Sequence, residues 1–62
     1  MKLFEHTTRR FRPIENLTDD ALATHLARTR TDDFASAERA YPEVYTARRE
    51  ALEAEARRRA NG

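Results

Sequence analysis

The chain has 62 residues, so it forms at most one small domain, and such a domain buries only about 60% of the surface that its unfolded chain exposes. It has no cysteine, which excludes disulfides and cysteine-based metal sites. Charged residues make up 37% of the sequence, yet the net charge is only +1, so no strong overall field directs the chain to nucleic acid or membranes. Because much of the apolar content is alanine, we expect a marginal monomer that gains from self-association or a partner.

The first 16 residues are predicted to form a basic arm that packs on the rest of the chain. Phe4 and Phe11 are seven residues apart, as on one face of a helix, but Thr7 and Thr8 are poor helix formers. The strict alternation of a regular strand is missing as well. We therefore expect an extended arm whose aromatic side chains contact the helices, with one turn of helix or a short strand as the alternatives.

The helical part spans residues 17–62, and its clearest element is a helix predicted over residues 19–30. Thr18 is a good N-cap, and the two aspartates that follow it place negative charge where the helix dipole favours it. Leu17 before the cap and Leu22 after it have the spacing of a hydrophobic staple. These start signals agree with one another, so the position of this helix is well determined.

A second helix is predicted to begin directly after the first, capped by Thr31 or Asp32. Such a short connection makes the two helices packed neighbours. Pro42 interrupts the helical pattern, and two interpretations remain open. Either the second helix ends near Tyr41 and a third runs from residue 42 to about residue 60, or one long helix kinks at the proline. We favour the break, because proline is well tolerated at the first position of a helix.

Small apolar residues recur at alternating steps of four and three through this region. They are Ala40, Val44, Ala47, Ala51 and Ala54, and we call them the alanine stripe. This spacing lets one helix seat closely against another. We expect the part near Val44 to pack within the chain. The first predicted helix, of ~18 Å, is too short to cover a last helix of ~28 Å, so we expect another molecule to cover the far part.

The sequence thus predicts an all-α fold of two or three helices, with a long C-terminal helix and the basic arm. The predicted function is that of a small non-catalytic regulatory protein, which binds a partner protein or itself through the C-terminal helix, with a homodimer as the simplest case. Tyrosines are good anchors for such an interface. The predicted protein-interaction residues are Tyr41, Tyr45, Ala47, Arg48, Ala51 and Leu52.

No catalytic arrangement is indicated by the residues present. His6 and His25 are the only histidines, and Gly62 is the only glycine, which excludes a glycine-rich phosphate loop. The aspartate pairs at the two predicted helix starts lie where caps belong, so capping explains them better than acid–base chemistry or cation binding. We expect no enzyme activity, catalytic residue, metal, cofactor or small-molecule substrate.

The alternative function is nucleic-acid binding by the basic residues near the two ends of the chain. These residues are Arg9, Arg10, Phe11 and Arg12 in the arm and Arg57, Arg58 and Arg59 at the C-terminus. Arginines would bind phosphates while Phe11 stacks on a base. Against a helix-turn-helix mode, the second helix would open with Asp32 and Asp33, which face DNA phosphates badly. Protein interaction is therefore favoured.

The sequence also bears on location and source. It has no apolar run of the length of a signal peptide or a membrane span, so we expect a cytoplasmic protein without membrane contact. Arginine supplies nearly all of the basic residues, and alanine is equally common. This bias is typical of GC-rich coding and favours a bacterial or phage source.

Overall fold

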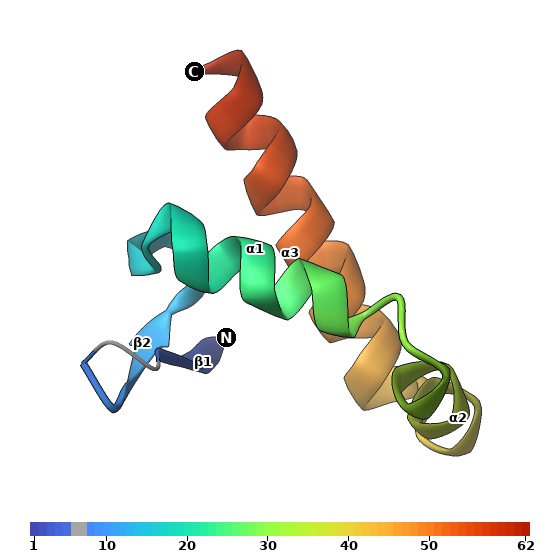
Figure 1. Ribbon diagram of the computed structural model, residues 1–62. Helices are drawn as coiled ribbons and strands as arrows, with labels where there is room; N and C mark the ends of the chain where they lie inside the picture. The colour runs from blue at the N-terminus through green and yellow to red at the C-terminus, as the bar shows by residue number, and fades with distance from the viewer. Residues whose placement is uncertain (6–7) are drawn as a thin grey trace.

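The computed structural model describes residues 1–5 and 8–62; His6 and Thr7, which entered the sequence argument, lie outside the described residues. The elements in chain order are β1 (Lys2–Glu5), β2 (Arg10–Pro13), the 3₁₀ turn η1 (Ile14–Asn16), α1 (Asp19–Arg28), α2 (Asp32–Ala40) and α3 (Pro42–Asn61). Figure 1 shows α1 crossing the middle of α3, the two strands beside α1, and α2 next to the first turns of α3.

The predicted all-α fold is wrong at the N-terminus, because the arm forms an antiparallel β-hairpin. The register pairs Leu3 with Arg12, Phe4 with Phe11 and Glu5 with Arg10. The expected alternation of apolar and polar residues is missing from the sequence because a glutamate occupies a buried position. Leu3 and Glu5 point to the buried face of β1, while Phe4 between them is only half-buried. The molecule as a whole remains mostly helical.

Two polar contacts attach the hairpin to α1. The Glu5 carboxylate is completely buried, and its Oε2 accepts a hydrogen bond from the backbone N–H of Thr18 at 3.2 Å. The Nε2 of His25 lies 2.8 Å from the carbonyl oxygen of Phe4, to which it donates. These contacts satisfy Oε2 of Glu5 and the carbonyl of Phe4, whereas the buried Oε1 of Glu5 accepts no hydrogen bond from the residues that the structure describes. The hairpin is therefore fixed at the start of α1 and near its end.

The predicted caps of α1 and α2 are confirmed. The hydroxyl of Thr18 accepts from the N–H of Ala21 at 3.1 Å, and that of Thr31 accepts from Phe34 at 3.2 Å. Helix α1 ends at Arg28, two residues before the predicted end. The Thr29 hydroxyl donates to the carbonyl of Leu26, which offers the last turn an alternative to further helical hydrogen bonds.

The predicted break at Pro42 is also confirmed. Tyr41 has φ −135° and ψ 67°, outside the helical region, and Pro42 is the first residue of α3. Proline disfavours helical geometry in the residue before it but suits the first helical turn. One non-helical residue thus separates α2 from α3, and the chain turns sharply there (Figure 1).

The core lies where the hairpin, α1 and the middle of α3 meet. Its buried apolar members are Leu3, Leu17, Ala21, Leu22 and Leu52, with Ile14, Leu26 and Ala56 packed against them. Leu17 and Leu22, the predicted hydrophobic staple, both belong to this cluster. Leu52 is only 1% exposed and is the largest apolar side chain fully enclosed. A core this small makes each of its members important for stability.

We predict that Leu52→Ala removes most of the stability of the fold. Truncation of a buried leucine costs about 2–5 kcal/mol, whereas a domain of this length has roughly 3–9 kcal/mol in total at ~0.05–0.15 kcal/mol per residue. Urea unfolding followed by circular dichroism measures the loss. The matched control is Glu50→Ala, which truncates an exposed side chain on the same helix. Equal effects of the two substitutions would contradict the position of the core.

Candidate functional site

Helix α3 buries one face and exposes another, and the alanine stripe falls largely on the exposed one. Leu52 and Glu55 are buried and Tyr45 is half-buried, so this face packs on the rest of the chain. On the other side Ala47 and Ala54 are exposed. The expected packing of the stripe near Val44 within the chain is wrong, because Val44 is exposed and the larger residues Tyr45 and Leu52 occupy the inward face instead.

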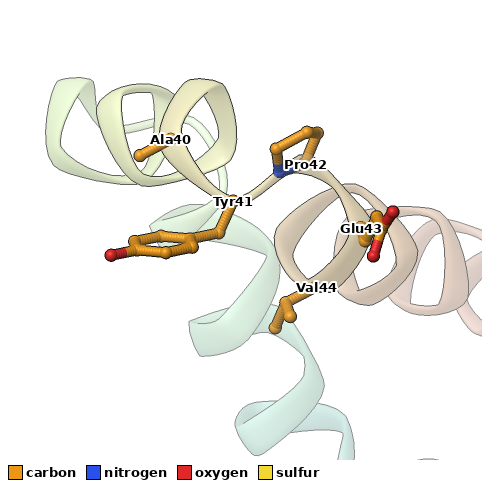
Figure 2. Close-up of a pocket in the computed structure, with 5 residues that line it drawn as sticks. All are labelled: Ala40, Tyr41, Pro42, Glu43 and Val44. Carbon is orange, nitrogen blue, oxygen red and sulfur yellow. The ribbon is translucent and has the colours of Figure 1, made fainter.

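The corner between α2 and α3 presents the largest exposed apolar side chains of the helical region. Tyr41 is 66% exposed and Val44 is 54% exposed. They border a shallow depression of about 250 Å³ whose lining runs from Ala40 to Val44. Figure 2 shows the Tyr41 ring extended beside α2, below Ala40, and Val44 projecting from the first turn of α3. The exposed part of the alanine stripe continues from this corner along α3.

Contacts between α2 and α3 hold the corner in place. The rings of Phe34 and Tyr45 meet edge to face with centroids 5.4 Å apart, and the guanidinium of Arg48 lies 5.2 Å from the Tyr45 ring centre. The Oε2 of Glu38 accepts from the Thr46 hydroxyl at 2.7 Å and lies 3.0 Å from the Arg49 guanidinium. The hydrogen bond from Thr46 is the largest cause of a lowered pKa of Glu38, and the hydrogen bond from Arg49 lowers this pKa further. The depression is thus supported by aromatic and ionic contacts behind it.

The six predicted protein-interaction residues do not form one surface. Tyr41 and Ala47 are exposed and Ala51 is half-buried, so these three remain accessible. Tyr45 contacts Arg48 within α3 and Phe34 of α2, and Leu52 belongs to the core. The sequence carried a signal for this division, because Tyr45 and Leu52 are seven residues apart on one helical stripe. Val44, Ala47, Ala51 and Ala54 follow another stripe beside it.

The C-terminal arginines proposed for nucleic acid are partly used within the chain. Arg58 and Arg59 both donate to the buried carboxylate of Glu55, at 3.0 Å and 2.7 Å from their Nε atoms. Arg59 also donates to Asp19 at 2.9 Å and to the carbonyl of Leu17 at 2.7 Å. It therefore links the end of α3 to the start of α1. Hydrogen bonds from Arg58, which has the larger effect, and from Arg59 lower the pKa of Glu55 to about 2.

The basic arm is likewise divided by the hairpin. Successive residues of a strand point to opposite faces, so Phe11 lies on the face opposite to Arg10 and Arg12. Arg12 pairs with Glu5 at 3.5 Å, whereas Arg9 and Arg10 are exposed. Arg57 is exposed at the other end of the chain. The structure therefore does not gather the predicted arginines and Phe11 into one binding surface.

Comparison of the chain with family models, curated proteins and solved structures finds no match. In the part of the chain that the structure describes, no helix combines the length and apolar character needed to cross a membrane. Within residues 1–5 and 8–62, histidine, aspartate and glutamate side chains do not gather in threes where they could hold a metal ion. The exposed surfaces are therefore the features of this molecule that bear on its function.

We predict that the hydrogen bonds from Arg58 and Arg59 to Glu55 make the stability of the fold sensitive to acid. Because the pKa of Glu55 is about 2 in the folded chain and ordinarily 4.5, its ionised form stabilises the fold above about pH 5, and this contribution is lost as the pH falls toward 2. Between these pH values, the unfolding free energy of Glu55→Gln should fall less than that of the wild-type chain, as measured by urea titration at each pH. Glu50→Gln, on the exposed face, is the matched control. A wild-type pH profile for the Glu55 variant would contradict this role.

Proposed function

We propose that this chain is a small non-catalytic interaction protein that binds another protein, or a second copy of itself, through the exposed face of its C-terminal helix. This face, the corner surface, consists of Tyr41 and Val44 at the corner and Ala47, Ala51 and Ala54 along α3. The observation that carries the proposal is the exposure of both Tyr41 and Val44 at the rim of one depression on a supported corner.

The chemistry of the corner surface suits a protein interface. Tyrosine is enriched at the centres of interfaces because it combines a large apolar area with a polar tip. The small side chains of Ala47 and Ala54 permit close approach of a second helix. The single residue between α2 and α3 pre-organises the corner, which lowers the entropy lost on binding. A partner would thus contact the Tyr41 ring at the corner and the small side chains along the exposed face of α3.

A second copy is the simplest partner, and a surface variant tests it. We predict that Val44→Asp weakens self-association at least about tenfold, because a buried interface would have to accommodate an unpaired charge. Val44 is the third residue of α3, where the helix dipole favours a negative charge, so the fold should be retained. Sedimentation equilibrium measures association, and circular dichroism on the same samples measures helix content.

Ala47→Glu should act in the same way, whereas Ala23→Glu on the exposed part of α1 is the matched control and should leave association unchanged. If the wild-type chain is monomeric at all concentrations, the self-association form of the proposal is wrong. A photo-crosslinking amino acid at position 41 then tests for a different partner in the source cell, with the same group at position 23 as control. Equal crosslinking from both positions would contradict the corner surface as the binding site.

A further inference from the structure

A second concave surface lies between the hairpin and the helices, away from the corner. It has a volume of about 240 Å³ and receives side chains from β1, β2 and all three helices. Three phenylalanines and three cations stand out in its lining. They are Phe4, Phe11 and Phe34 and Lys2, Arg28 and Arg48, and we call this surface the aromatic groove. Among the described residues that line it, none is acidic.

The aromatic side of the groove is open to solvent at Phe11. This ring is 69% exposed, although its neighbour Phe4 is half-buried and meets it edge to face with centroids 5.5 Å apart. The hydrogen bond between His25 and the carbonyl of Phe4 holds β1 against α1, so the two rings have a fixed support. An exposed phenylalanine on a supported strand is a stacking platform for a planar ring.

The cations of the groove come from separate parts of the sequence. Lys2 is exposed on β1, Arg28 is the last residue of α1, and Arg48 belongs to α3. Arg48 is held over the ring of Tyr45 at 5.2 Å, which orders its guanidinium. The fold thus concentrates positive charge beside the rings in a chain whose net charge is only +1. A ligand that combines a flat apolar group with negative charge would complement this arrangement.

We propose that the aromatic groove binds single-stranded nucleic acid, with a base stacked on Phe11 and the adjoining phosphates held by Lys2 and Arg48. The volume of the groove, about 240 Å³, is sufficient for one planar ring system. An acidic peptide would bring one charge with each side chain, whereas a nucleotide in a strand brings a ring flanked by two phosphates. The open position of Phe11 favours a strand that passes across the groove over a free nucleotide enclosed in a pocket.

The aromatic groove is separate from the corner surface, and it differs from the nucleic-acid surface expected from the sequence. Of the residues in that earlier set, only Phe11 lines the groove. Its sequence neighbours Arg10 and Arg12 lie on the other face of the hairpin. Of the cations that replace them, Lys2 lies on the paired strand β1, whereas Arg28 and Arg48 are brought to the groove by the packing of α1 and α3.

The first test is fluorescence anisotropy of a labelled oligothymidylate of about ten nucleotides, at low salt of about 50 mM. Wild-type protein should bind this strand more tightly than a duplex of the same length, a polyglutamate peptide or free thymidine monophosphate. Phe11→Leu keeps an apolar side chain but removes the stacking face, and it should weaken binding about five- to tenfold. Phe11→Tyr keeps the face and is the matched control, with affinity close to that of wild type.

The second test separates the groove from general positive charge. Arg48→Ala and Arg57→Ala remove the same charge from α3, but only Arg48 lines the groove. Arg48→Ala should weaken binding and reduce the slope of log affinity against log salt by about 0.7, as expected for one lost phosphate contact. Arg57→Ala should leave the slope unchanged. Circular dichroism of each variant confirms that its helices are retained.

Several outcomes would overturn the proposal. One is no binding of the oligonucleotide by wild-type protein up to about 100 µM, the weak end of non-specific nucleic-acid binding. Others are equal effects of Arg48→Ala and Arg57→Ala, or equal affinities of the two Phe11 variants. Tighter binding of the acidic peptide would assign the groove to a protein ligand, and effective competition by the free nucleotide would assign it to a small molecule.

Discussion

Burial of Leu52 between the hairpin and α1 fixes how the last helix is oriented about its own axis. A helix presents only one face to its neighbour, so the choice of Leu52 and Tyr45 for the inward face leaves the alanine stripe largely outside. Large side chains occupy the inward face because their burial removes more apolar area from water than the burial of alanine does. The accessible surface of the molecule is therefore a consequence of where its few large apolar residues pack.

Polar contacts extend this small core and connect its parts. Buried Glu5 joins the hairpin to the N-terminus of α1, and Glu55 with Arg59 joins the end of α3 to the same region. Carboxylates enclosed in this way are costly unless they are paired, and each has a cation or a backbone N–H beside it. Some of the arginines that the sequence offered for ligand binding therefore pair with buried carboxylates within the fold.

The two surfaces described above differ in chemistry and arise from different constraints. The corner surface is local, because Tyr41 and Val44 are three residues apart and Pro42 sets the turn between them. The aromatic groove is assembled from distant segments and exists only when β1, α1 and α3 are packed together. A short chain can present both because they form at different junctions, the corner between α2 and α3 and the groove between the hairpin and the helices.

The sequence by itself determined the local features of this protein. The caps at Thr18 and Thr31 and the break before Pro42 depend on neighbouring residues, so their chemistry is visible in the sequence. The hairpin was missed, because the buried Glu5 hides its alternation and its strands are stabilised by distant contacts with α1. The sequence marks two candidate stripes on α3, and only the tertiary structure decided which of them is inward and which cations lie beside Phe11. Those outcomes depend on competition between segments for one small core, and such competition is not encoded in any single stretch of the chain.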